Sequence, residues 1–201
     1  MTIVEERPEA GHQAARRAMI DSQLRTSGVN ADFVLRRMGA VAREDFVPES
    51  ARGFAYIDRA IALGHGRHLA APVVQGMMLQ EARPTAADKA LVVDGGSGYL
   101  AELLRPLVGP LETIGPAKAA DKPHKKADVT LLVIDGAIEQ LPEALAGRLV
   151  EGGRVVTGLV DEGITRLAIG RKAAGHVALL PLAELGIPAL PGFAAPKEWS
   201  F

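Results

Sequence analysis

A short apolar run that ends in a glycine-rich turn and continues into a helical pattern most restricts how this chain can fold. The run covers residues 90–93, the turn residues 94–98 and the helical pattern residues 99–107. Glycine lets the backbone turn tightly and approach a ligand closely, and amide groups at the start of a helix point toward the same place. Strand, glycine turn and helix predict the first unit of a doubly wound α/β sheet.

The residues after this unit continue the α/β pattern. Residues 111–114, 129–134 and 154–159 are predicted strands, and the second is so uniformly apolar that we expect it to be central and buried on both faces. A helix is predicted over 141–149, closed by Gly152 and Gly153. Two further runs, 166–170 and 177–180, predict a β-hairpin.

The residues before the glycine turn have mainly helical spacing. Helices are predicted over 13–24 and over 73–82. Between them another helix is predicted to begin with Asn30 or Asp32 as its N-cap. Residues 64–72 are rich in glycine and have no period, which predicts a loop. The chain is therefore expected to be one domain, 1–201, with a helical part at 1–88 and an α/β part at 89–201, because no long linker separates the two.

Charge and composition exclude several classes of protein. The 23 basic and 24 acidic side chains give a net charge of -1, whereas nucleic-acid-binding proteins usually carry a basic excess. The basic run at 122–126 is predicted to be a solvated loop. There is no cysteine and no metal-ligand spacing. No signal peptide or membrane span is recognisable, so we expect a cytoplasmic protein that binds neither membranes nor nucleic acid.

A series of segments in the same order resembles the protein-L-isoaspartate O-methyltransferases. The segments are 19–29, 34–38, 41–48, 55–60, 64–72, 96–99 and 141–154. The resemblance spans roughly residues 16–160. It implies a Rossmann-like methyltransferase sheet with extra N-terminal helices, S-adenosylmethionine as the cofactor, and methyl transfer to the carboxylate of isoaspartyl residues in proteins.

The resemblance also assigns two groups of site residues. The cofactor would lie at the glycine turn, on Asp94, Gly95, Gly96, Ser97, Gly98 and Tyr99. The isoaspartyl substrate would lie at the preceding loop, on Arg67, His68, Leu69 and Ala70. No residue is predicted to be catalytic, because a carboxylate is already ionised at neutral pH and methyl transfer to it depends on positioning.

The chain departs from the family pattern at the positions that would hold the cofactor. The family turn reads acidic-x-Gly-x-Gly-x-Gly-Tyr, whereas this chain has Val92 at the acidic position and Asp94 at the first glycine. Gly115 stands near the acidic residue that contacts the ribose hydroxyls in the family. By strand alternation, the neighbouring Glu112 is expected to face elsewhere.

Two other departures affect the sheet and the substrate loop. Only residues 116–128 connect the strand at 111–114 with the buried strand, and Pro116 and Pro123 make a helix there unfavourable. One β-α unit is therefore predicted to be absent. Ala70 and Ala71 precede Pro72, where the family has serine and glutamine.

Three functions remain open from the sequence. The first is isoaspartyl methyl transfer. The second is a catalytically silent binding or scaffold module, in which the strand at 111–114 lies at an exposed sheet edge and a homodimer covers that edge. The third is a retuned site at the glycine turn that binds a different small molecule.

Overall fold

The fold is built around a six-stranded mixed sheet, seen in a computed structural model that describes residues 8–119 and 127–195. The strand order is β4-β3-β5-β6-β7-β8; the first four strands are parallel and the last two antiparallel to their neighbours. The strands are β3 (Ala90–Val93), β4 (Leu111–Ile114), β5 (Val129–Ile138), β6 (Leu149–Asp161), β7 (Ile164–Ala173) and β8 (His176–Glu184). This is the predicted Rossmann-like α/β fold.

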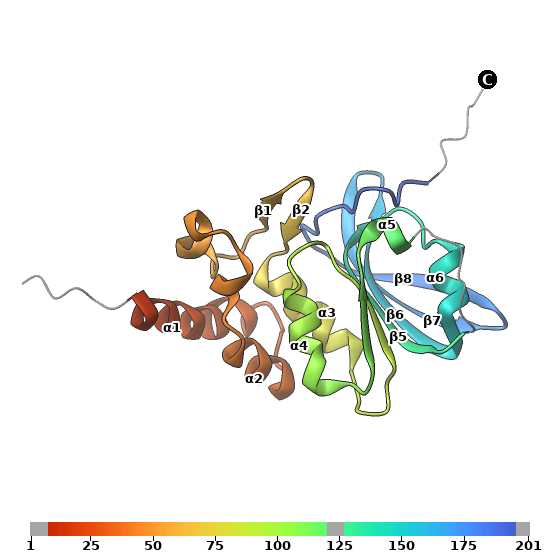
Figure 1. Cartoon of the computed structure of the whole chain (residues 1–201), viewed down its shortest axis with the longest axis horizontal. Coiled ribbons are helices and arrows are strands. Elements are labelled where there is room, and N and C mark those ends of the chain that lie inside the picture. Colours follow the sequence, from red (N-terminus) through yellow and green to blue (C-terminus); the bar gives the residue numbers. More distant parts are fainter. Residues whose placement is uncertain (1–7, 120–126, 196–201) are drawn as a thin grey trace, which may run out of the picture.

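Helices cover both faces of the sheet (Figure 1). One face carries α3 (Pro72–Ala82) and α4 (Tyr99–Leu104), and the other carries α5 (Pro116–Ala119) and α6 (Glu143–Arg148). Side chains of β3 alternate between the two layers: Val92 packs in the cluster with α3 and α4, and Val93 in the cluster with α6. Burial on both faces explains why β3 is apolar at every position.

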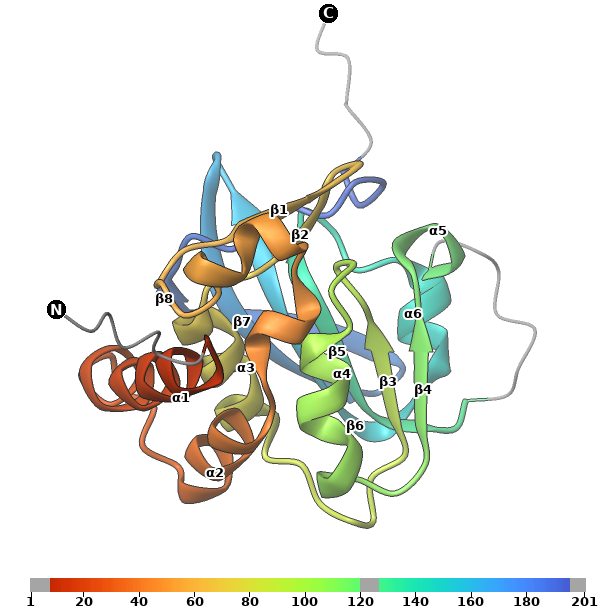
Figure 2. The same cartoon turned by 60° about the vertical axis from the view of Figure 1, so that its left-hand side comes forward.

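The N-terminal residues form a helical layer next to α3 and α4 (Figure 2). This layer comprises α1 (Pro8–Met19), a π-helical turn (Ile20–Leu24), α2 (Asp32–Ala40) and two 3₁₀ turns (Arg43–Phe46 and Glu49–Phe54); a third 3₁₀ turn, Arg105–Leu107, follows α4. The prediction that the side chain of Asn30 or Asp32 caps α2 is wrong. Instead, Oε1 of Gln80 on α3 accepts hydrogen bonds from the backbone N–H groups of Asn30 and Ala31, at 3.0 and 3.1 Å.

The glycine-rich segment predicted as a loop contains a small antiparallel hairpin. Strand β1 (Ile61–Gly64) pairs with β2 (Arg67–Leu69). Left-handed backbone at Gly64, His65 and Gly66 makes the tight turn between them. The strands are so short that their alternation could not be told from a loop in the sequence.

Strand β4 is the edge strand of the described sheet. It pairs with β3 in parallel, and no other described strand pairs with it. Its connection to β5 contains the one-turn helix α5, with Pro116 at the first position, where proline is tolerated. The predicted loss of one β-α unit from this side of the sheet is therefore seen in the topology. The basic run at 122–126 lies outside the described residues.

The remaining sequence predictions need smaller changes. The predicted hairpin is the β7–β8 pair. Helix α6 ends at Arg148 instead of Leu149, and Gly152 and Gly153 lie within β6, where the register with β5 is irregular, so they bend a strand and do not close the helix. Among the described residues, no helix combines the length and hydropathy that a membrane span requires.

Candidate functional site

The glycine turn leaves the carboxyl end of β3 and is held at both ends by hydrogen bonds. The backbone N–H of Asp94 donates to the carbonyl of Ile114 at the end of β4 (2.9 Å), and Oδ1 of Asp94 accepts from the N–H of Gly98 (2.8 Å). Gly96 (φ 113°) and Gly98 (φ 75°) adopt left-handed backbone, which favours glycine. Asp94 therefore fixes the turn from the position where the family pattern has a glycine.

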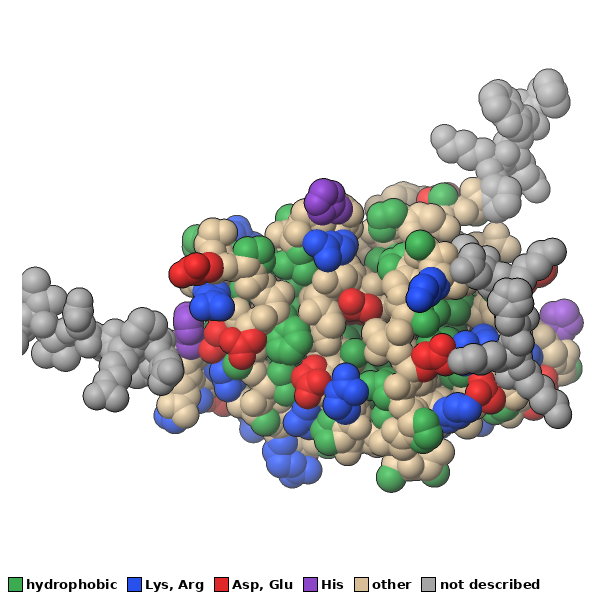
Figure 3. Space-filling view, in the orientation of Figure 1, with side chains coloured by type: hydrophobic (Ala, Val, Ile, Leu, Met, Phe, Trp, Pro, Cys, Tyr) green, Lys and Arg blue, Asp and Glu red, His purple; other side chains and the backbone are tan. Residues whose placement is uncertain are grey.

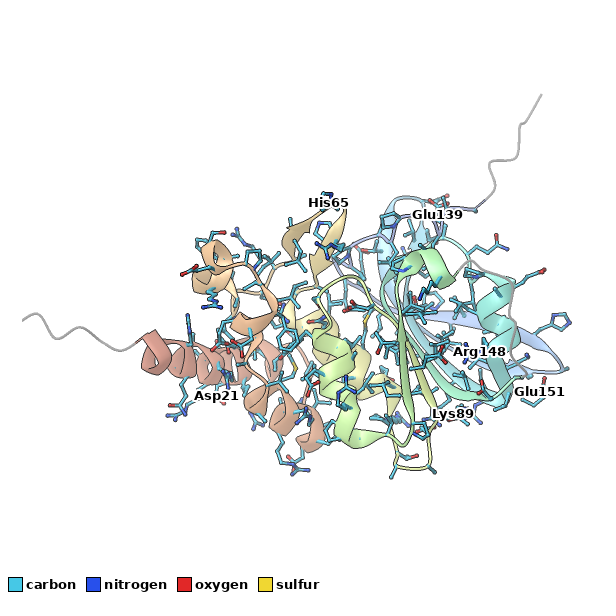
Figure 4. All side chains as sticks on the ribbon, viewed as in Figure 1. Asp21, His65, Lys89, Glu139, Arg148 and Glu151 are labelled. Atoms are coloured by element: carbon cyan, nitrogen blue, oxygen red, sulfur yellow. The ribbon has the colours of Figure 1, made fainter. Side chains whose placement is uncertain are left out.

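The predicted substrate segment and the predicted cofactor turn meet. The backbone N–H of His68 on β2 donates to the carbonyl of Gly95, at 3.3 Å. The Arg67 side chain lies directly on the turn, since a Cβ added to Gly96 would be 2.5 Å from its Cβ. Figure 4 shows His65 at the tip of the hairpin, pointing away from the body. Thus β2, and not the hairpin tip, contacts the turn.

Three of the predicted site residues contribute buried side chains to the core. Leu69 is fully buried and Ala70 nearly so. Tyr99 is also fully buried, and its ring packs edge-on against Phe46 with the ring centroids 5.1 Å apart. The side chains of Arg67 and His68 remain at least partly exposed. The side chains of Leu69, Ala70 and Tyr99 therefore shape the site from beneath.

A buried polar chain that the sequence analysis missed runs beneath the turn. The guanidinium of Arg43 donates to Oε1 of Gln75 (2.6 Å), and Nε2 of Gln75 donates to Oδ2 of Asp135 (3.1 Å). Arg43 also donates to the carbonyls of Ala55 and Ala70. All three side chains are buried, so each polar group needs the partner that the chain of hydrogen bonds provides.

Asp135 is the most perturbed acid in this chain of hydrogen bonds. Burial raises the pKa of its carboxyl to about 7, and the negative charge of Asp94 adds to the increase, while Gln75 and Arg43 oppose it. A carboxyl group that titrates near neutral pH at the carboxyl end of a parallel strand is typical of a functional site. The signal in the sequence was an aspartate that interrupts the apolar run 129–138.

The C-terminal segment covers the end of β5 beside the same site. The backbone N–H of Ala137 donates to the carbonyl of Pro188, and the N–H of Leu190 donates to the carbonyl of Ala137, both at 2.8 Å. Leu190 packs on Gly136 so closely that an added Cβ would lie 2.4 Å from its Cγ. An apolar side chain therefore lines this edge beside Gly95, whose added Cβ would be 3.7 Å from Leu190.

The end of β4 offers no carboxylate at the expected ribose position. Gly115 and Pro116 follow the strand there. Glu112 does face elsewhere, as predicted: its Oε2 accepts a hydrogen bond from Arg148 at 2.8 Å, on the α6 side of the sheet. No group of three or more acidic or histidine side chains among the described residues could hold a metal ion. Acidic and basic side chains are interspersed over the face in Figure 3.

Comparison with known proteins connects this site with one family. Residues 14–117 match the family model described as protein-L-isoaspartate(D-aspartate) O-methyltransferase (PCMT). Protein-L-isoaspartate O-methyltransferase 2 of Anaeromyxobacter sp. (strain Fw109-5) is 30% identical over 181 residues, which are 78% of this chain and 74% of that protein. Protein-L-isoaspartate O-methyltransferase of Koribacter versatilis (strain Ellin345) is 29% identical over 191 residues, 83% of this chain and 86% of that protein.

A solved structure has the same fold. It is described as a protein-L-isoaspartate O-methyltransferase from Plasmodium falciparum, crystallised in complex with S-adenosyl-L-homocysteine. The TM-score is 0.66 at 17% sequence identity, and the match covers 89% of this chain and 97% of that one. At this level of identity, the likeness establishes the fold alone.

Proposed function

The chain belongs to the protein-L-isoaspartate O-methyltransferase family, and from that premise we propose that it methylates isoaspartyl carboxylates of proteins with S-adenosylmethionine. The observation that carries this proposal is the contact between the two predicted halves of the site. The hydrogen bond from His68 to Gly95 holds the substrate segment against the glycine turn, so a donor and an acceptor bound there would be adjacent.

The residues at the glycine turn fit the methionine end of S-adenosylmethionine. The left-handed glycines Gly96 and Gly98 present backbone without a Cβ, and Asp94 places a carboxylate beside them that suits the ligand's α-ammonium group. The ribose end fits less well, because Gly115 provides no side chain at the end of β4. We therefore expect weaker binding than a site with a carboxylate at both ends would give.

The proposed reaction requires orientation more than acid or base catalysis. When bound, S-adenosylmethionine would supply an electrophilic methyl group to an oxygen of the isoaspartyl carboxylate, with S-adenosylhomocysteine as the leaving group. The carboxylate is ionised at neutral pH. Arg67 and His68 would orient it through charge and hydrogen bonds, and the buried Leu69 and Ala70 exclude water from below.

The test is calorimetric titration with S-adenosylmethionine and S-adenosylhomocysteine, followed by methylation of an isoaspartyl peptide. Dissociation constants on the order of micromolar and a methyl ester on the peptide are expected. Gly96→Ala should weaken binding at least tenfold, because the new Cβ meets the Arg67 side chain. Gly175→Ala is the matched control: Gly175 also has positive φ (81°), but an added Cβ there meets nothing within 4 Å.

The structure also favours a second candidate, a catalytically silent module that self-associates. Its support is the edge strand β4, the glycine at the ribose position and Ala70 in place of a serine. This candidate predicts no heat with either ligand and a dimer in light scattering. A monomer at all concentrations would exclude the self-association, and ligand binding with peptide methylation would exclude the silent module.

A further inference from the structure

A hollow at the opposite edge of the sheet has no role in the proposed methyl transfer. Its cavity, about 480 Å³, lies between the end of α3 and strands β6, β7 and β8. Arg154, in its lining, pairs with Leu131 of β5, which in turn pairs with Ala90, the first residue of β3. The cavity therefore lies at the amino edge of the parallel strands, whereas the glycine turn lies at the carboxyl edge.

Strand register builds the cavity wall from two adjacent rows on one face of the sheet. One row is apolar: Val156 pairs with Ile169, which pairs with Leu180. The next row is basic, because Arg154 pairs with Arg171. Directly paired residues point to the same face, and so do residues two positions apart in a strand. The two rows therefore place positive charge beside an apolar surface.

The positive charge in this cavity is only partly neutralised. Arg154 donates to Asp88 at 2.7 Å. By contrast, the guanidinium groups of Arg171 and Arg83, both in the lining, have no hydrogen bond or ion pair within the described chain. Glu81 also lines the cavity but lies beyond ion-pair distance of both. Like charges directly opposite each other in a strand pair are unfavourable, so this arrangement suits an anion.

Three further features of the lining concern Arg83, Arg154 and Leu180. Arg83 has left-handed backbone (φ 43°) where α3 ends, a conformation that favours glycine. The Nε–H of Arg154 has no acceptor among the described residues, but it is buried, so a ligand in the cavity would meet Arg171 and Arg83 first. At the apolar row, Leu180 keeps 61% of its surface exposed, although it borders a concave site. An apolar surface therefore remains available beside the unpaired guanidinium groups of Arg171 and Arg83.

We propose that this cavity binds a small amphipathic anion: an apolar body with one terminal carboxylate. The apolar body lies on Ile169 and Leu180, and the carboxylate lies between Arg171 and Arg83. The cavity volume falls in the range typical of small-molecule sites. Its concave shape favours a small molecule over a second copy of the chain, and the experiment distinguishes the two.

The experiment compares two fluorescent probes on the whole protein. Anilinonaphthalene sulfonate carries an aromatic body and an anionic group, and N-phenylnaphthylamine has the same body without the charge. The anionic probe should bind saturably at one site per chain and at least tenfold more tightly than the neutral one. Decanoate should displace it and decanol should not, and its affinity should decrease with added salt.

Four variants locate the probe. Arg171→Gln should weaken binding of the anionic probe about tenfold and leave the neutral probe unchanged, whereas Leu180→Ser should weaken both. Arg83→Gly should weaken anionic binding without lowering the melting temperature, because glycine suits the left-handed backbone. Arg166→Gln is the control: it lies on the same strand but pairs with Asp161 outside the cavity.

Two results would overturn the proposal. One is equal binding of both probes with no effect of Arg171→Gln, which would place the probes on another apolar surface. The other is a dimer that Leu180→Ser dissociates and that excludes the anionic probe, which would make this face a protein interface.

Discussion

Nε2 of Gln75 lies 3.1 Å from Oδ2 of Asp135, and this contact joins α3 to the carboxyl end of β5 beneath the glycine turn. The carboxyl group is buried, and Arg43 lies beyond Gln75. A single polar chain thus connects the N-terminal helical layer with the edge of the sheet where the cofactor is proposed to bind. The carboxyl group of Asp135 and the guanidinium of Arg43 lie at the two ends of this chain.

Asp135→Asn should change how stability depends on pH. Because the pKa of Asp135 in the folded chain is raised to about 7, the folded state holds this proton while the unfolded state has lost it. The contribution of the protonated Asp135 carboxyl to the free energy of unfolding is complete below about pH 4 and is lost as pH rises through 7. One pKa unit corresponds to about 1.4 kcal/mol, so the variant should gain roughly 2 to 4 kcal/mol relative to wild type between pH 5 and pH 8.

Urea unfolding at the two pH values measures this difference. The control is Asp161→Asn, at an exposed aspartate on β6. Its free energy of unfolding relative to wild type should be the same at pH 5 and pH 8. A wild-type protein as stable at pH 8 as at pH 5 would contradict the assignment.

Arg43→Lys should destabilise the protein by about 3 kcal/mol. The Arg43 guanidinium is fully buried, donates to three acceptors and lies over the ring of Tyr99. Lysine has no planar fork to reach all three, so it would leave buried oxygens unpaired. Arg36→Lys, at an exposed pair with Asp32, is the matched control and should cost less than about 0.5 kcal/mol. Equal effects of the two changes in urea unfolding would refute the prediction.

Arg148→Met should loosen the edge of the sheet. Arg148, labelled in Figure 4, donates to Glu112 of β4 (2.8 Å) and to Asp128 just before β5 (3.3 Å). Glu112 raises the pKa of Arg148, with Asp128 adding to the shift. We expect a loss of about 1–2 kcal/mol and faster amide exchange in β4. Arg105→Met, at the exposed pair with Glu102, should leave the β4 amides unchanged. Unchanged amide exchange in both variants would show that the hydrogen bonds of Arg148 do not hold β4 at the edge of the sheet.

Gly136→Ala and Leu190→Ala should interact. The first places a Cβ 2.4 Å from Cγ of Leu190, and the second removes that side chain and leaves a cavity. Each single change is expected to cost about 2 kcal/mol or more. In the double variant the new methyl group enters the space that Leu190 vacates, so the combined cost should be smaller than the sum by about 1 kcal/mol. Additive effects in thermal unfolding would mean that the two positions do not share this contact.

The sequence was most informative where a pattern is local. The bounds of β3 and β4 agree with the predicted runs 90–93 and 111–114. For β3 the reason is that a parallel strand buried on both faces is continuously apolar. The edge position of β4 followed from the short connection after it. By contrast, nothing local identified the partner of Gln75, which lies 60 residues away in the chain. Likewise, Gln80 replaces the predicted cap on α2 from about 50 residues away.

The pairing of Ala137 with Pro188 and Leu190 has a consequence for the order in which a newly made chain matures. Synthesis proceeds from the N-terminus, so the end of β5 emerges from the ribosome about 50 residues, and the glycine turn about 90 residues, before the segment that completes the edge beside them. Until then, the N–H and carbonyl groups of Ala137 have no backbone partner from that segment. The nascent protein therefore completes this edge only after residues 188–190 have emerged, later than all the strands of the sheet.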